Sequence, residues 1–248
     1  MVYRNQVAGR ATRCVAALAF ALVGANAFAD VSDVFLRIEA TSTAGTGVYE
    51  ILTNDVTYNP EDDSYSYSGA GIGLWSGATQ IGAVNNIGLT VRNDPTIFTN
   101  FNLTAGTLPT TFTLTLAQVL FPAINNPDAV ASVGLTLSDS DASGSASLSG
   151  NAGTGGVNSF VARYNGSSIF AEGIPSISVS SVGGSSAGNL NTGLQTIAGS
   201  VSSMQAVLDF DLSARDSASG TGFYVIVPEP AAVVLLAFGV LFHLRRRS

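Results

Sequence analysis

Lysine is absent from the 248-residue sequence, and its ten basic residues are all arginine. The only cysteine is Cys14 and the only histidine is His243, so residues 30–227 contain neither. That range cannot hold a disulfide, a thiolate site, a histidine-ligated zinc, a Ser-His-Asp triad or a Schiff base. A Walker-type phosphate loop needs a lysine and is excluded as well. The catalytic chemistry that is left is that of paired carboxylates.

Positive charge is scarce in residues 30–227. Four arginines stand against sixteen acidic residues there, which gives a formal net charge of 4 − 16 = −12. Nucleic acids and anionic lipid surfaces are bound through clusters of positive charge. Neither is therefore expected as a partner of this range.

The first 29 residues have the three zones of a secretory signal peptide. A start with three arginines and no acid is followed by an apolar stretch at residues 15–23. Small residues at Ala27 and Ala29 then offer a signal-peptidase site before Asp30. A transmembrane helix is the alternative, but it needs about 20 apolar residues and this stretch has about half that number. We therefore expect residues 1–29 to be removed on export.

Residues 228–248 read as a second targeting segment. Val227 precedes this segment. The segment then contains, in order, Pro228, Glu229 and Pro230, an apolar stretch at 231–244, and Arg245, Arg246 and Arg247. The prolines mark a domain edge, and the arginines resist translocation. As a single hydrophobic helix the apolar segment would be about 21 Å long, against about 30 Å of hydrocarbon. This length favours a transient membrane stop over a permanent anchor, with a buried terminal helix as the alternative.

This ordered tail resembles the PEP-CTERM sorting signal of bacterial envelope proteins. The resemblance covers about the last 22 residues and implies cleavage near Pro228–Pro230 by an exosortase, a membrane-embedded protease. It also implies a Gram-negative cell that makes an exopolysaccharide or biofilm matrix. We therefore expect an exported chain with an inner-membrane intermediate, and then a place in the cell envelope or extracellular matrix. The resemblance predicts a location and not an activity.

Residues 30–227 have the pattern of an all-β domain. Residues 111–116 alternate threonine with large apolar side chains, which is typical of a half-buried strand. About ten to twelve short strands with glycine- and serine-rich turns predict an antiparallel β-sandwich of jelly-roll-like type. The sequence does not decide the structure of two segments. Residues 140–156 could form a loop or a pair of outward strands, and residues 189–203 could form a short helix at one end.

Turn residues predict three hairpins. They join 81–84 to 87–91 through Asn85 and Asn86, 160–164 to 168–170 through Asn165 and Gly166, and 206–212 to 223–227 through a polar turn. The last of these would deliver the chain directly to the sorting signal.

One stretch matches the start of a calcium-binding loop. Asp139, Asp141 and Ser143 alternate oxygen ligands, and Gly144 permits a sharp turn. The twelfth position is Gly150, where such loops carry a bidentate glutamate. A looser Ca²⁺ site and a solvated turn are therefore both open, and no other cofactor is expected.

A carbohydrate contact is a further candidate. Tyr65 and Tyr67 share one face of a predicted strand, Trp75 follows, and three acids precede them at residues 61–63. Sugars are commonly held by stacking on aromatic rings and by hydrogen bonds to acids. The alternative is an ordinary turn followed by ordinary strand aromatics.

The spacing of the glutamates selects no catalytic pair. Those within residues 30–227 are Glu39, Glu50, Glu61 and Glu172. We therefore expect a structural or adhesive protein and not an enzyme. A carbohydrate-binding module for exopolysaccharide is the alternative, and a carboxylate glycosidase comes third.

Overall fold

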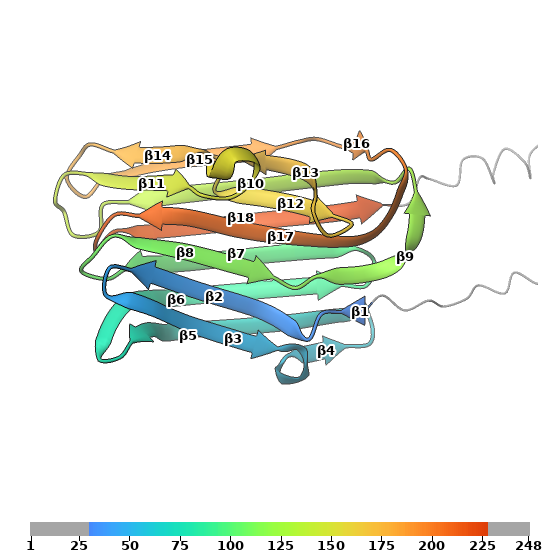
Figure 1. Ribbon diagram of the computed structural model, residues 1–248, viewed down its shortest axis with the longest axis horizontal. Coiled ribbons are helices and arrows are strands. Elements are labelled where there is room, and N and C mark those ends of the chain that lie inside the picture. The colour runs from blue at the N-terminus through green and yellow to red at the C-terminus, as the bar shows by residue number, and fades with distance from the viewer. Residues whose placement is uncertain (1–29, 228–248) are drawn as a thin grey trace, which may run out of the picture.

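The computed structural model describes residues 30–227, which form two antiparallel β-sheets packed face to face (Figure 1). The expected all-β sandwich is thereby confirmed. The signal peptide at 1–29 and the sorting segment at 228–248, with its apolar part 231–244, lie outside the described residues. Within residues 30–227, the helices are the single turns η1 (Thr53–Asp55) and η2 (Thr154–Gly156), and neither has the length to cross a membrane.

Eighteen strands make up the two sheets, instead of the ten to twelve expected. The ten-stranded sheet contains β1 (Asp30–Val31), β2 (Val34–Ser42), β3 (Gly45–Leu52), β8 (Thr110–Leu116), β9 (Val119–Asn125), β11 (Ala146–Gly150), β12 (Phe160–Tyr164), β13 (Ser168–Gly173), β14 (Ser176–Val179) and β17 (Ser200–Leu212). The eight-stranded sheet contains β4 (Thr57–Asn59), β5 (Ser64–Ser76), β6 (Thr79–Arg92), β7 (Thr96–Ala105), β10 (Asp128–Ser138), β15 (Ser185–Asn191), β16 (Gln195–Thr196) and β18 (Ser217–Val227).

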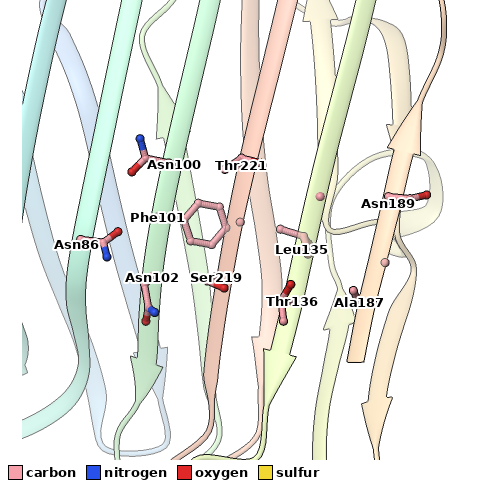
Figure 2. A pocket seen from close by; sticks show the side chains of 13 residues that line it. Asn86, Asn100, Phe101, Asn102, Leu135, Thr136, Ala187, Asn189, Ser219 and Thr221 are labelled. Carbon is pink, nitrogen blue, oxygen red and sulfur yellow. The ribbon is translucent and has the colours of Figure 1, made fainter. Parts of the chain in front are cut away.

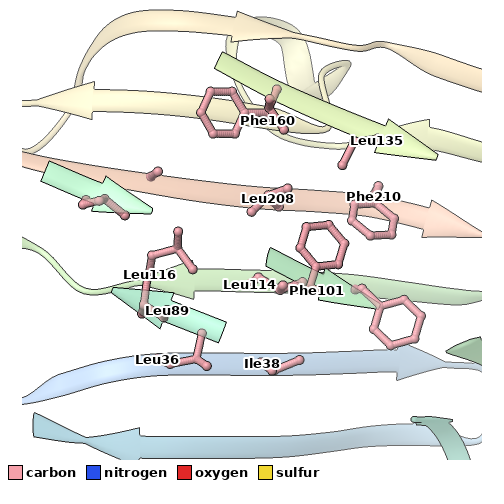
Figure 3. Packing of buried hydrophobic residues seen from close by; sticks show 14 of the residues in the cluster. Leu36, Ile38, Leu89, Phe101, Leu114, Leu116, Leu135, Phe160, Leu208 and Phe210 are labelled. Atoms are coloured by element: carbon pink, nitrogen blue, oxygen red, sulfur yellow. The ribbon is translucent and has the colours of Figure 1, made fainter. Parts of the chain in front are cut away.

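The core lies between the sheets and follows from the period-two pattern of the strands. In β8, the apolar residues Phe112, Leu114 and Leu116 are buried, while the threonines between them are partly exposed. Figure 3 shows such side chains from the ten-stranded sheet facing Leu89 and Phe101 of the other sheet. Full burial of one side chain of this size contributes roughly 1.5–3 kcal/mol, so the repeated alternation is what holds the two layers together.

The hairpin expected at Asn85 and Asn86 is wrong. Strand β6 runs without interruption through both residues, and its register with β7 shifts between Val84 and Asn86. Asn85 is the extra residue of this bulge, and its amide donates to Asn102 Oδ1 and Thr104 Oγ1, both at 2.8 Å. A bulge and a tight turn both suit asparagine, so the residue type alone does not distinguish them. The Asn165–Gly166 turn between β12 and β13 is confirmed.

The expected final hairpin is also wrong, because β17 and β18 lie in different sheets. Strand β17 pairs with β8, β9, β11 and β12, whereas β18 pairs with β7 and β10. The short segment 213–216 carries the chain from one sheet to the other. Alternation predicted both strands correctly, but it contains no information on which strand is the partner.

The two segments left open are mainly extended. Residues 189–203 hold the end of β15, all of β16 and the start of β17, so the helix considered there is wrong. Residues 140–156 begin as a loop and continue as β11, whose Ala146 and Leu148 are buried. This strand faces the core, in contrast to the outward strands considered.

The first strand begins and the last strand ends at the same end of the sandwich. Strand β1 begins at Asp30 and β18 ends at Val227, both at the right-hand end of the long axis in Figure 1. The loop after β10 and the crossing at 213–216 lie at the opposite end. We call these the terminal end and the distal end.

Candidate functional site

A hollow of about 480 Å³ crosses the outer face of the eight-stranded sheet. Figure 2 shows that its side chains come from five neighbouring strands, β6, β7, β18, β10 and β15. Volumes of about 300–1,000 Å³ are typical of sites for small ligands. The hollow is open to solvent along the sheet, so an extended ligand could lie across the strands.

Strand register places two polar rows beside each other in this hollow. One row contains Ala187, Thr136, Ser219, Asn102 and Asn86, and the next contains Asn189, Gly134, Thr221, Asn100 and Gly88. The residues between the rows, such as Leu135 and Phe101, are buried in the core. Because side chains alternate between the two faces of a strand, the polar rows point outward.

Small residues are the cause of the hollow. A Cβ atom added to Gly134 would have no neighbouring atom within 4 Å, so the space above this residue is open. Ala187 and Ser219 also leave room. The backbone of Gly134 has no positive φ. Glycine at this position therefore leaves the space above the strand open and is not required by a turn conformation.

The lining of the hollow mixes polar and apolar groups and carries no formal charge. The side chains of Asn86, Asn100 and Asn189 are exposed on this face. Asn102 accepts one hydrogen bond from Asn85 and keeps its own N–H groups free. These amides present donors and acceptors to solvent that the fold itself does not use.

Two phenylalanines lie in the row next to Asn100 and Thr221. Phe98 of β7 and Phe223 of β18 are direct cross-strand partners. They are 43% and 36% exposed, respectively. The same face thus offers a pair of aromatic rings beside a row of amides and hydroxyls.

The expected calcium ligands lie at the distal end. Carboxylate oxygens of Asp139, Asp141 and Asp216 lie within 4.8 Å of one another. The sequence pattern missed Asp216, because it comes from the crossing between β17 and β18, far along the chain.

Hydrogen bonds within the protein are sufficient to hold these carboxylates in position without a cation. The Asp139 carboxylate accepts backbone N–H groups from Ser143 at 3.0 Å, Gly144 at 2.9 Å and Gly183 at 2.9 Å. Burial raises the pKa of Asp139, but these hydrogen bonds outweigh it and hold that pKa below its ordinary value. Asp216 likewise accepts the N–H of Ser140 and the hydroxyl of Ser213. The cluster ties distal loops together, and calcium binding there stays a prediction.

The three expected carbohydrate contacts are not brought together. Tyr65 and Tyr67 share a face of β5, but that face packs against the core, and the Tyr67 hydroxyl is hydrogen bonded to Tyr49. Trp75 is 54% exposed and lies over Gly73. About 26 Å of strand separates Tyr67 from Trp75. The acids of the preceding turn also have partners: Asp63 accepts from Tyr58 and Asn93, and Asp62 lies 3.4 Å from Arg92.

Three of the four glutamates within residues 30–227 lie in strands of the ten-stranded sheet, and the fourth, Glu61, lies in the turn between β4 and β5. Glu39 pairs with Arg37 at 2.7 Å, and Glu172 accepts the N–H of Thr154 at 2.7 Å. Glu50 lies in β3 and Glu61 in a turn, both exposed. Glu50 is the direct cross-strand partner of Arg37, so Glu39 and Glu50 flank this arginine on one face of β2 and β3, whereas Glu61 and Glu172 belong to other elements.

Of the predicted sorting residues, Val227 is described: it ends β18 and is 41% exposed. Ala27, Ala29, Pro228, Glu229, Pro230, Arg245, Arg246 and Arg247 lie outside the described residues.

No protein-family model matches the sequence, and a comparison with curated proteins gives no significant match. The polar hollow was not anticipated from the sequence. Its signal was present in the alternate polar residues of 96–105 and 217–227, but their neighbours come from strands far apart in the chain.

Proposed function

We propose that the chain is an exported protein of the cell envelope or extracellular matrix, with a structural or adhesive role. A signal peptide at 1–29 would export it, and an exosortase-type protease would cut it near Pro228–Pro230. The observation that carries the proposal is the junction itself: the last strand ends at Val227, and Pro-Glu-Pro follows immediately. The apolar segment and three arginines then follow in the order of a PEP-CTERM signal.

The position of β18 supports processing at this point. This strand is central, held by β10 on one side and β7 on the other, and its last buried residue is Ile226. A cut after Val227 would leave every buried side chain of residues 30–227 in place. The protease would thus find its site directly beside a folded domain that survives cleavage.

The shared terminal end supports a display role. Since β1 begins and β18 ends at the same end of the long axis, the tail would direct the distal end away from the membrane for as long as it is uncut (Figure 1). The outer faces of both sheets would then be open to the surroundings of the cell. Such an orientation suits an adhesive or structural surface.

The strand order supports the finer expectation of a jelly-roll-like connection. Strands β7 and β8, consecutive in sequence but in different sheets, lie beside β18 and β17. A two-stranded ribbon that rolls across both layers gives this arrangement.

Intact-mass measurement of the surface-exposed or released protein tests the proposal. We expect a start at Asp30 and an end between Val227 and Pro230. Replacing residues 228–230 by alanine should abolish C-terminal processing, while the control Asn54→Ala, on the exposed turn η1, should be processed normally. Recovery of wild-type protein that still ends at Ser248 would sink the sorting claim.

A further inference from the structure

We infer that the hollow on the outer face of the eight-stranded sheet binds a neutral polysaccharide chain. The inference deepens the proposed adhesive role. It rests on the proposed function only in that the protein must be exported to reach an extracellular polysaccharide. The site itself is defined by described residues between Asn86 and Phe223, and its chemistry does not depend on how the tail is processed.

The polar groups of the hollow match those of a sugar. A sugar hydroxyl both donates and accepts hydrogen bonds. The side-chain amide of an asparagine and the hydroxyls of Thr221 and Ser219 can also do both. The side chains of Asn86, Asn100 and Asn189 are exposed to solvent. They can therefore exchange hydrogen bonds to water for hydrogen bonds to a ligand, and no bond within the protein is broken.

The aromatic pair supplies the second half of sugar recognition. A pyranose ring has faces of C–H groups that pack on aromatic rings, while its edge carries hydroxyls. Phe98 and Phe223 are exposed in the row beside Asn100 and Thr221. One sugar unit on the phenylalanines would place its hydroxyls, or those of the next unit, over the amides.

Charge selects a neutral chain. No acid or base lines the hollow, so it offers no partner for an ionised ligand. Residues 30–227 carry four arginines against sixteen acids, and this excess of negative charge disfavours anionic polysaccharides.

The length of the face suits a polymer. Five strands at about 4.8 Å spacing span roughly 19 Å from β6 to β15, which is more than a single sugar ring requires. A second copy of this chain is the competing occupant, and the test separates the two.

Affinity electrophoresis in native gels tests the inference with the full chain purified in mild detergent. The gels contain dextran, galactomannan, xyloglucan or a mixed-linkage β-glucan, and a parallel gel contains alginate. We expect retardation by at least one of the four neutral polysaccharides and none by alginate.

Three variants locate the site. Gly134→Ile fills the hollow, and its β-branched side chain suits a strand position with open space, so the fold should be kept. It should weaken binding at least about tenfold, and Asn100→Ala about two- to tenfold, as expected for lost hydrogen bonds. Asn54→Ala, on a remote exposed turn, should bind like the wild type. Thermal melting of each variant checks that the fold is intact.

The outcomes are distinct. No retardation by any of the neutral polysaccharides would overturn the inference, and so would equal retardation of a folded Gly134→Ile variant. Retention on alginate alone, lost in salt, would assign the face to anionic chains instead. A wild-type dimer in light scattering that Gly134→Ile dissociates would assign the face to a second copy. Each result stands whether or not the tail is cut, which the intact-mass measurement decides separately.

Discussion

The hydroxyl groups of Tyr49 and Tyr67 are hydrogen bonded to each other at 2.7 Å, one from each sheet. Tyr49 belongs to β3 of the ten-stranded sheet and Tyr67 to β5 of the eight-stranded sheet. Both rings pack against the edge of the core. The pair is therefore a polar link between the two layers near one of their open sides.

Removing either hydroxyl should destabilise the sandwich. Tyr67→Phe leaves the Tyr49 hydroxyl partly buried without its partner, which should cost about 0.5–1.5 kcal/mol in the free energy of unfolding. Tyr49→Phe should cost a similar amount. The double variant should lose less than the sum of the two, because no orphaned hydroxyl is left. Urea unfolding measures all three, and additive losses would show that the bond does not couple the sheets.

The same pair predicts a loss of stability at high pH. Burial, followed by the hydrogen bond to Tyr49, raises the pKa of Tyr67 from 10.0 to about 12. The folded state thus holds this proton more tightly than the unfolded state, whose tyrosine ionises near its ordinary pKa. The stabilisation is complete below about pH 10 and is lost as the pH rises towards 12. The melting temperature of the wild type should therefore fall more steeply over this window than that of Tyr67→Phe.

Tyr224 predicts a stabilising substitution. Its side chain is fully buried and stacked on Phe170, with ring centroids 5.6 Å apart, but its hydroxyl has no hydrogen-bond partner in the described structure. Burial raises the pKa of this group well above its ordinary value. Tyr224→Phe keeps the ring and removes the unpaired hydroxyl, so stability should rise by about 1 kcal/mol or more.

Tyr224→Ala is the control for the ring itself, and it should cost about 3–5 kcal/mol. If Tyr224→Phe instead proves clearly less stable than the wild type in chemical denaturation, the hydroxyl has a partner, such as a buried water.

The strands themselves could be predicted from the sequence, but their partners could not. Alternation in residues 111–116 and 206–212 identified β8 and part of β17, because a buried face imposes that pattern on any strand. The same pattern suggested that 206–212 and 223–227 form a hairpin, although they belong to opposite sheets. Local sequence fixes which face is buried, whereas pairing depends on distant segments.

The candidate sites divide in the same way. Asp139 and Asp141 were found because they are close in sequence, but Asp216 joins them only through the fold. The hollow needed Gly134, Asn100 and Thr221 side by side, and nothing in the order of the chain brings these three together. Sites made from neighbouring strands are thus the least visible in a single sequence.

Asp139 should be a stabilising residue whether or not calcium is present. Asp139→Ala leaves the N–H groups of Ser143, Gly144 and Gly183 without their acceptor, and the distal loops lose a common anchor. The melting temperature should therefore fall in excess EDTA as well as in added calcium. In excess EDTA, Asp141→Ala, an exposed acid that accepts the N–H of Ser143, is the matched control and should change it little. A wild-type melting temperature that rises strongly with calcium would show that the cluster holds the ion.

The neighbouring acids Asp209 and Asp211 of β17 should respond oppositely to the same substitution. Burial raises the pKa of Asp209 more than its polar neighbours Asn151 and Thr113 lower it, and the charges of Asp211 and Glu39 raise it further. Its Oδ1 has no partner in the described structure, whereas Asp211 Oδ1 accepts from Thr111 at 2.6 Å and Asn151 at 2.9 Å. Asp209→Asn should therefore stabilise the protein at neutral pH, and Asp211→Asn should destabilise it.

The pH dependence of the stability difference between the wild type and Asp209→Asn shows whether the charge of Asp209 is the cause of that difference. A raised pKa means that the folded state binds the proton more tightly, so the wild type gains stability as the pH falls through that pKa, while Asp209→Asn does not. The advantage of the variant should be largest at neutral pH and should shrink on acidification. Chemical denaturation at neutral and acidic pH measures this difference, and an advantage that stays constant with pH would show that the charge of Asp209 is not its cause.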